Sequence, residues 1–459
     1  MTTKTGGVNS REVAFEALLL ILEQGEMSHL VISRALGKYQ YWDKRDRAFF
    51  TRLTEGTLER LLTLDYVLGR FSSVPVKKMK PVIRMILRMG AYQILYMDSV
   101  PDSAACNESV RLAQKKGFGS LKGFVNGVLR SIVREKDSVL DPAGMSLSVR
   151  YSVPEWIAEL WTGAYGEDKA ETMLKTSLQD RKTTVRFDEG RITKEELIRM
   201  LDREQVTAEA CAWPECALAL SGYDYLEGLT AFKEGYISVQ DVSSMLVALS
   251  AGIQPGFQVL DVCAAPGGKS LHAAELLRGT GHVEARDLTE KKAALIEENI
   301  ARTGLENITV KVWDALAYDE QWEQRADVVL ADLPCSGLGV IGKKNDLKYR
   351  ITEEACAELA LLQRRIVSIA SRYVKPGGCL IYSTCTLDPA ENEENAVWIT
   401  KNLPFETESL LPYLPDGLKE LMPDEARKEA EKGFLTILPG IFPADGFFLA
   451  RFKRKGISL

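Results

Sequence analysis

The chain has 459 residues and a net charge of −6, and 46% of its residues are hydrophobic and 27% charged. This globular balance predicts two or three domains with sizeable cores. No run of about 18 apolar residues is present and the first seven residues are polar, so we expect no membrane span and no signal peptide, and a cytoplasmic protein.

Residues 1–140 are predicted to form an all-α bundle. Apolar and small residues recur at helical spacing over 82–95 behind Pro81, and further helices are expected over 107–116 and 121–134. This segment has 22 Lys and Arg against 14 Asp and Glu, a balance of +8 in an otherwise acidic chain. Such asymmetry is typical of a nucleic-acid-binding module, although a solvated helical surface explains it equally well.

Three stretches of this bundle carry a family resemblance. They are LRMGAYQILYM (87–97), NESV (107–110) and GFVNGVLR (123–130). They resemble the NusB domain, an all-helical RNA-binding fold, over most of the first 135 residues. The resemblance implies that residues 1–140 bind RNA.

Residues 141–234 are predicted to form a small α+β linking domain. A helix is expected from Glu155 through Trp161, a strand over 182–187 and an amphipathic helix over 194–201. The stretch 226–236 is expected to be loop or short strand.

Residues 235–459 are predicted to form a Rossmann-like α/β domain. Strands and helices alternate along this part of the chain, which indicates a mostly parallel, doubly wound sheet. The expected elements are strands 258–262, 282–285, 309–312, 327–330 and 379–382 and helices 269–277, 291–302 and 353–373. The segments 435–437 and 446–452 are expected to pair antiparallel at the sheet edge.

The first of these strands leads into a glycine turn that is suited to a ligand. Pro266, Gly267 and Gly268 let the backbone approach a bound molecule closely, but the spacing matches neither GxGxxG nor a P-loop, so a ligand without phosphates is favoured. Asp287 follows the second strand and suits ribose hydroxyls, and Asp314 follows the third and suits an adenine amino group.

This order of strand-end carboxylates is typical of S-adenosylmethionine-dependent methyltransferases, although such Asp residues also serve as helix caps and turn formers. The predicted cofactor-binding residues are Cys263, Ala264, Ala265, Pro266, Gly267, Gly268, Lys269, Asp287, Asp314 and Asp332.

Two cysteines follow predicted parallel strands. Cys335 lies in DLPCSG (332–337) and Cys385 in YSTCT (382–386). Strand ends of an open α/β sheet meet at one rim, so both thiols are expected beside the cofactor, a combination that suggests methyl transfer to an electron-poor ring carbon.

The eight cysteines are scattered, so reduced thiols are expected, and no metal site is expected because only three histidines exist and Cys211 and Cys216 lack a second pair. The other explanation of a strand-end cysteine is a small buried apolar residue, which we expect for Cys263, Cys356 and Cys379.

The second half of the chain resembles the RNA cytosine-5 methyltransferases. The matching stretches are VQDVSS (239–244), AAPGGK (264–269), DLPCSG (332–337), YSTCT (382–386) with ENE (391–393), and DGFF (445–448). The resemblance implies that Cys385 is the nucleophile, that Cys335 assists release of the methylated base and that Asp332 contacts cytosine N3. It also implies that Lys269 lies near both cofactor and active centre.

A NusB-like domain joined to such a catalytic domain is similar to the RsmB family of bacterial 16S ribosomal RNA cytosine-5 methyltransferases. That family implies 16S ribosomal RNA as partner, in an unassembled or partly assembled small subunit. Val153 departs from the family, which usually has His there. The loop lysines Lys343, Lys344 and Lys348, with Tyr349 and Arg350, are candidates for RNA phosphate contacts.

Three alternatives stay open. A transfer-RNA cytosine-5 methyltransferase would use the same chemistry, and methylation of an exocyclic amine would favour an Asn/Asp-Pro-Pro-aromatic sequence where Cys335 stands. A non-catalytic ribosome assembly or antitermination factor would use only the RNA-binding bundle.

Overall fold

The computed structural model describes residues 9–180 and 182–456, and its contacts divide them between two compact units. The first unit consists of Met1–Leu178 with Ile341–Arg350, and the second of Gln179–Val340 with Ile351–Leu459. The predicted domain limits at 140 and 234 remain a proposal. Among the described helices, none is both long and apolar enough to cross a membrane.

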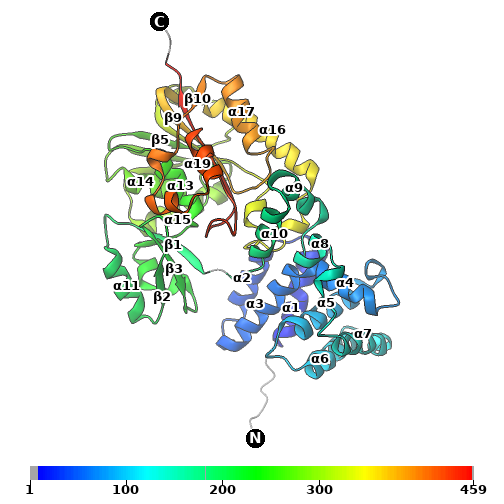
Figure 1. Ribbon diagram of the computed structural model, residues 1–459. Coiled ribbons are helices and arrows are strands. Elements are labelled where there is room, and N and C mark those ends of the chain that lie inside the picture. Colours follow the sequence, from blue (N-terminus) through cyan, green and yellow to red (C-terminus); the bar gives the residue numbers. More distant parts are fainter. Residues whose placement is uncertain (1–8, 181, 457–459) are drawn as a thin grey trace. The chain divides into compact units, whose positions relative to one another are not determined.

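The first unit is helical, which confirms the all-α prediction for its described residues up to 140 (Figure 1). Its helices are α1 (Ser10–Gln24), α2 (Ser28–Lys38), α3 (Lys44–Glu59), α4 (Leu61–Phe71), α5 (Pro81–Tyr96), α6 (Asp102–Lys115), α7 (Lys122–Arg134), α8 (Leu147–Tyr151), α9 (Glu155–Tyr165) and α10 (Glu167–Thr176). Central α5 has Pro81 in its first turn and buries nearly every residue from Ile83 to Ile94. A Cβ on its Gly90 would lie 2.8 Å from the Leu129 side chain of α7, so glycine permits this close packing.

The predicted start of the helix at residue 107 is wrong, because α6 begins at Asp102. Pro101 precedes it and lacks an N–H that a helix start would leave unpaired, and Asp102 places a carboxylate in the first turn.

The segment Ile341–Arg350 follows the fourth strand of the catalytic sheet in sequence, yet it packs within the first unit. Asp346 accepts hydrogen bonds from the backbone N–H of Ser28 at 3.1 Å and from its hydroxyl at 2.5 Å. The Lys348 Nζ donates to the Glu59 carbonyl at 3.0 Å, and the Tyr349 hydroxyl donates to the Ser152 carbonyl at 2.9 Å. The predicted phosphate contact of Lys348 is therefore wrong, because its side chain is only 2% exposed and is used inside the unit.

Replacing Lys348 with methionine should stabilise the protein at pH 7 and below. Burial lowers the pKa of Lys348 from 10.5 to about 7, so between these values the unfolded chain binds a proton that the folded chain does not. Wild-type stability should therefore rise as the pH increases from 7 to 10.5, and Lys348→Met should remove that rise. We expect a gain of at least about 1 kcal/mol at pH 6.5, or roughly 2–4 °C in melting temperature.

Calorimetric melting curves from pH 6.5 to 10 measure this effect. Lys344→Met is the control, since Lys344 is exposed in the same segment. If the stability of Lys348→Met rose with pH as steeply as that of the wild type, Lys348 would not be a buried, poorly protonated amine.

The second unit begins with a small antiparallel sheet in the order β2-β3-β1-β4. Its elements are β1 (Thr183–Phe187), α11 (Lys194–Arg203), β2 (Thr207–Ala210), β3 (Ala217–Ser221), α12 (Thr230–Lys233) and β4 (Ile237–Val239). β1 and α11 are where the sequence predicted them, and α11 begins with a capping box between Thr193 and Glu196. The prediction of loop or strand over 226–236 is wrong over Thr230–Lys233, which forms α12.

The large sheet has the order β10-β12-β9-β8-β5-β6-β7, with β11 paired to β12. Strands β5 to β9 pair in parallel, whereas β12 pairs antiparallel with β9, β10 and β11, which confirms the predicted antiparallel edge. The strands are β5 (Gln258–Asp261), β6 (His282–Asp287), β7 (Ile308–Val312), β8 (Ala326–Asp332), β9 (Val374–Thr384), β10 (Phe405–Thr407), β11 (Phe434–Ile437) and β12 (Phe447–Arg454).

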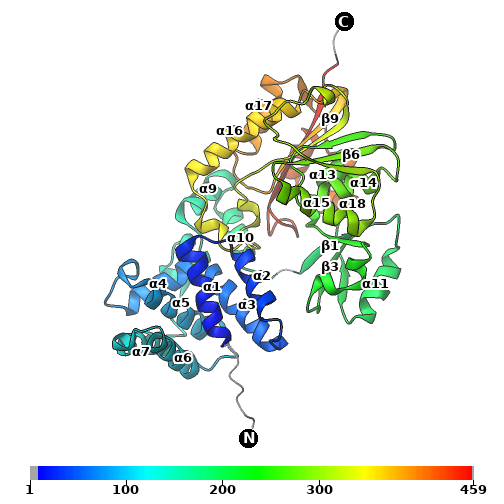
Figure 2. The same cartoon turned by 180° about the vertical axis from the view of Figure 1, so that it is seen from behind.

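Helices cover both faces of this sheet, as Figure 2 shows for α13–α15 on one side and α16 and α17 on the other. Alternation along β8 explains the two cores: Val328 and Leu330 face the first group, and Val329 and Ala331 the second. The helices are α13 (Val242–Ser250), α14 (Gly268–Leu276), α15 (Glu290–Thr303), α16 (Glu353–Ala370), α17 (Glu393–Asn402), α18 (Asp416–Leu421) and α19 (Asp424–Glu431). The Rossmann-like fold is thus confirmed.

Candidate active site

The turn between β5 and α14 requires glycine. Gly267 has φ +105°, and a Cβ there would lie 3.1 Å from Cγ2 of Ile296 on α15. Gly268 begins α14, whose first N–H groups have no partner within the helix. The backbone of Ala264 and Ala265 is held against β6, since the Ala264 N–H donates to the Arg286 carbonyl at 2.8 Å.

The two aspartates predicted to bind nucleoside differ in their surroundings. Asp287 ends β6 and is buried, and its carboxylate accepts the N–H groups of Ala265 at 3.0 Å and Leu288 at 2.7 Å. The Lys292 ammonium also lies 3.1 Å from this carboxylate. A carboxylate has about four acceptor positions, so Asp287 holds the glycine turn and still has acceptor capacity for a ribose hydroxyl. Asp314 is exposed beyond β7 and accepts the N–H of Leu316 at 2.9 Å.

Asp261 is a buried carboxyl under the same turn that the sequence did not single out. Burial raises its pKa to about 7, although the Ser270 hydroxyl donates to it at 2.6 Å and the Cys263 N–H at 3.3 Å. The sequence feature that could have indicated this carboxyl is Ser270, a hydroxyl donor that follows Lys269 directly. The bonds fix α14 against the end of β5. Burial also raises the pKa of Cys263, which keeps that partly exposed thiol neutral.

The two predicted thiols lie side by side. Asp332 of β8 and Ser383 of β9 are paired residues, so the segments that follow these parallel strands run next to each other. The Sγ atoms of Cys335 and Cys385 are 3.3 Å apart. The hydrogen bond to Cys385, together with burial, raises the pKa of Cys335 well above its ordinary value. A neutral Cys335 thiol at this distance shares a hydrogen bond with the sulfur of Cys385, in which either sulfur can be the donor.

Lys269 and Asp332 form an ion pair beside these thiols. The Lys269 Nζ and an Asp332 oxygen are 2.6 Å apart, and the other Asp332 oxygen accepts the Ser383 hydroxyl at 2.8 Å. Burial lowers the pKa of Lys269, but Asp332 and the negative charge of Cys385 more than offset it, so the net pKa is raised. Because this interaction is mutual, the ammonium stabilises a Cys385 thiolate.

The site thus combines two thiols in hydrogen-bonding contact, an ammonium and a carboxylate. All four groups lie at or just beyond the carboxyl ends of β5, β8 and β9, where an α/β sheet binds its ligands. Of the three cysteines expected to be small buried apolar residues, Cys356 and Cys379 are 3% and 6% exposed, which confirms the prediction for them. The prediction is wrong for Cys263, which is partly exposed because it lies in the turn after β5.

Known families match almost the whole chain. The family described as 16S rRNA methyltransferase RsmB/F matches residues 249–453, the NusB family residues 8–134, and an RsmF/B-like ferredoxin-like domain residues 153–223. A probable ribosomal RNA small subunit methyltransferase B of Bacillus subtilis is 37% identical over 97% of this chain and 99% of its own length. The chain belongs to the RsmB family of ribosomal RNA small subunit methyltransferases. A Synechocystis relative with the same description is 33% identical over 97% of this chain and all of its own length.

Solved structures share the fold. The crystal structure of PH0851 covers 98% of this RsmB-family chain and 100% of its own, with a TM-score of 0.80 and 24% identity. NSun6 from Pyrococcus horikoshii with SFG covers 66% of this chain and 98% of its own, with a TM-score of 0.57 and 21% identity.

As a member of this RsmB family the chain is a methyltransferase, and its cofactor is S-adenosylmethionine. The turn at Gly267 and Gly268 and the buried carboxylate of Asp287 fit such a ligand, because they offer an unobstructed backbone and hydroxyl acceptors without a phosphate-binding loop. Its place in the family also makes it a ribosomal RNA enzyme.

Proposed function

We propose that this RsmB-family enzyme methylates C5 of a cytosine in 16S ribosomal RNA through a covalent bond between Cys385 and C6. The 3.3 Å contact between the Cys335 and Cys385 sulfurs, beside Lys269 and Asp332, supports the proposal most strongly. Exocyclic amine methylation requires no thiol, and a non-catalytic assembly factor would require neither thiol nor ion pair.

Cytosine C5 is a poor nucleophile and has to be activated before it accepts a methyl group. The Cys385 thiolate adds to C6, and the electron pair displaced onto C5 then forms the new carbon–carbon bond. S-adenosylmethionine, when bound, supplies an electrophilic methyl group on a sulfonium. Loss of the C5 proton to a base restores the C5–C6 double bond, and Cys385 leaves as a thiolate.

The side chains around Cys385 have distinct roles in this scheme. The Lys269 ammonium stabilises the thiolate before attack and again when it leaves, and Asp332 contacts N3 of the ring. Cys335, whose sulfur is 3.3 Å from that of Cys385, donates its S–H to the departing thiolate and so assists release of the product.

The proposed cofactor site is the rim from β5 to β8. Cys263, Ala264, Ala265, Pro266, Gly267, Gly268 and Lys269 form its floor, and Asp287, Asp314 and Asp332 supply its carboxylates. Asp287 accepts from the ribose hydroxyls, and exposed Asp314 accepts from the adenine amino group.

The substrate is 16S ribosomal RNA in an unassembled or partly assembled small subunit in the cytoplasm. The target base has to leave its stack to reach a covalent site, which costs least in a single-stranded region. The NusB-like bundle, with its excess of positive charge, supplies phosphate contacts.

We expect 5-methylcytidine as the product. Purified enzyme and methyl-labelled S-adenosylmethionine are incubated with unmodified 16S ribosomal RNA and, in parallel, with unmodified transfer RNA, and the nucleosides are separated by mass spectrometry. Label in 5-methylcytidine from 16S RNA supports the proposal. Label in N4-methylcytidine, or in transfer RNA alone, would replace it with one of the alternatives.

A further inference from the structure

Two neighbouring buried residues, Glu391 and Asn392, each hold one of the two thiol segments. Both side chains are 0% exposed, and they lie in the turn between β9 and α17. We propose that Glu391 is a positioning residue for Cys335 and Asn392 is a positioning residue for Cys385. The inference rests on the proposed function, which gives the two thiols separate steps.

Glu391 acts on the peptide groups that flank Cys335. Its carboxylate accepts the N–H of Ser336 at 3.1 Å and the side-chain amide of Gln363 at 2.7 Å. The same Gln363 amide donates to the Pro334 carbonyl at 2.9 Å. The backbone is thus held on both sides of Cys335 by Glu391 and Gln363.

The orientation of Gln363 is itself determined by buried partners. Its side-chain oxygen accepts the Tyr382 hydroxyl at 3.0 Å and the Asn395 amide at 2.9 Å. Its nitrogen must therefore face Pro334 and Glu391, and Glu391 must present acceptors. Both Glu391 oxygens face the Ser336 N–H, at 3.4 and 3.1 Å, so a donor in place of either oxygen would oppose that N–H.

Asn392 acts in the same way on the segment around Cys385. Its oxygen accepts the Thr384 hydroxyl at 2.5 Å, and its nitrogen donates to the Thr386 carbonyl at 3.0 Å, so it bonds the residues before and after the thiol. The hydroxyls of Ser336 and Thr386, each one residue beyond a thiol, share a hydrogen bond of 2.6 Å.

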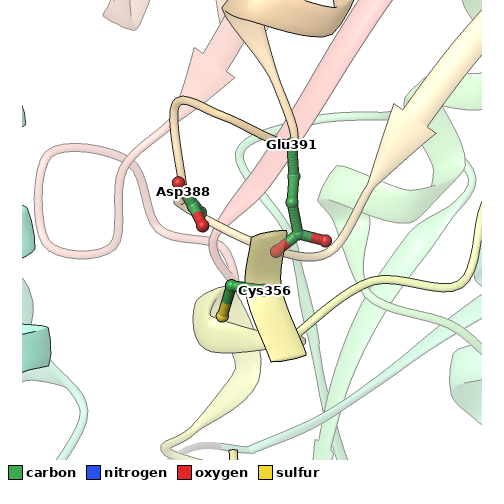
Figure 3. Close-up of side chains that lie close together, drawn as sticks. All are labelled: Cys356, Asp388 and Glu391. Carbon is green, nitrogen blue, oxygen red and sulfur yellow. The ribbon is translucent and has the colours of Figure 1, made fainter. Parts of the chain in front are cut away.

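Figure 3 shows Glu391 close to Cys356 of α16 and to Asp388, which precedes it in the same turn. These three groups have ligand atoms within 4.8 Å of one another, but the hydrogen bonds to Glu391 already account for its burial. Burial raises the pKa values of Asp388 and Glu391 and raises that of Cys356 to about 12. The pKa of Cys335 is raised mainly by its hydrogen bond to Cys385, and burial is the next cause. The negative charge of Glu391 adds to the same shift.

The first test compares the size-matched variants Glu391→Gln and Asn392→Asp. In Glu391→Gln an amide NH2 replaces one of the two oxygens that face the Ser336 N–H at 3.4 and 3.1 Å, so a donor opposes that N–H whichever way the amide turns. Asn392→Asp removes the donor to Thr386. Because a displacement of about 1 Å costs up to roughly 100-fold in rate, each should lose tenfold or more in turnover on 16S RNA. The impaired steps should differ: Glu391→Gln should accumulate a denaturation-resistant protein–RNA adduct, whereas Asn392→Asp should form adduct at least tenfold more slowly and accumulate none.

The control is Glu393→Gln, at the residue that follows Asn392 and begins α17. Glu393 accepts the Thr436 hydroxyl at 3.0 Å and bonds neither thiol segment, so its variant should keep wild-type adduct kinetics. Equal loss of both steps in all three variants, in parallel with melting temperature, would mean a purely structural role and overturn the proposal.

The second test measures thiol placement without catalysis. Diamide takes two electrons and the two thiol protons as a Cys335–Cys385 disulfide forms, and peptide mapping by mass spectrometry gives its rate. We expect at least tenfold slower cross-linking in Glu391→Gln and Asn392→Asp than in Glu393→Gln. Unchanged rates would overturn the positioning roles. Slower cross-linking in an enzyme that produces no 5-methylcytidine would leave the positioning intact and refute the proposed function instead.

Discussion

Cys385→Ala should abolish methyl transfer to 16S ribosomal RNA and should form no covalent complex with it. Without the thiolate, C5 has no route to sufficient electron density, so the expected loss is roughly four orders of magnitude or more. The measurement is incorporation of labelled methyl from S-adenosylmethionine, alongside binding of cofactor and RNA, which should persist because the sulfur belongs to neither recognition surface. Cys379→Ala, a buried cysteine of the same sheet, is the control and should stay active.

Cys335→Ala should give the opposite phenotype, a trapped adduct. Addition to C6 requires only Cys385, so the bond should form, but the departing thiolate loses the S–H donor now 3.3 Å away. A protein–RNA band that survives denaturing electrophoresis, at least tenfold more abundant than in wild type, is expected. If Cys335→Ala were inactive without adduct and Cys385→Ala accumulated it, the two roles would be reversed.

The sequence predicted the catalytic sheet and the meeting of its strand ends because both depend on local signals. Apolar runs of strand length alternate with helical periodicity from residue 258 onward, and the predicted bounds of β5, β6 and α15 agree with the structure to within two residues. Parallel strands place their carboxyl ends at one rim, so the meeting of Cys335, Cys385 and Asp332 followed from their positions in the chain.

Features that depend on long-range packing were not predictable in this way. Lys348 looks like an exposed basic loop residue, and only the packing of its segment into the helical unit buries it. Gln363 is an ordinary polar residue of an amphipathic helix until the fold places it beside Pro334 and Glu391. The short strands β2 and β3 lack the period-two contrast that signals a half-buried strand, since three of the four residues of β2 are exposed.

Lys269→Met should lower methyl transfer at pH 7 by roughly 100- to 1,000-fold. The ammonium compensates Asp332 at 2.6 Å and interacts with a Cys385 thiolate, and such an interaction is of the order of 4 kcal/mol at an effective dielectric constant of 20. Methionine removes the positive charge and leaves the Asp332 charge beside the sulfur, so both changes disfavour the thiolate.

The pH dependence distinguishes this role of Lys269 from cofactor binding. A less stabilised thiolate forms only at higher pH, so the acidic limb of the single-turnover rate should move to higher pH and much of the lost rate should return near pH 9. Alkylation of Cys385 by iodoacetamide should shift in the same direction without RNA or cofactor. Lys311→Met removes a similar ion pair, 3.0 Å from Asp319, that does not touch the thiols, and it should leave both profiles unchanged. A loss of rate that is equally large at every pH would show that Lys269 contributes through binding. If Lys269 instead favours the thiolate, the loss of rate shrinks at high pH, because the Cys385 thiol then loses its proton to the solution without help from the ammonium.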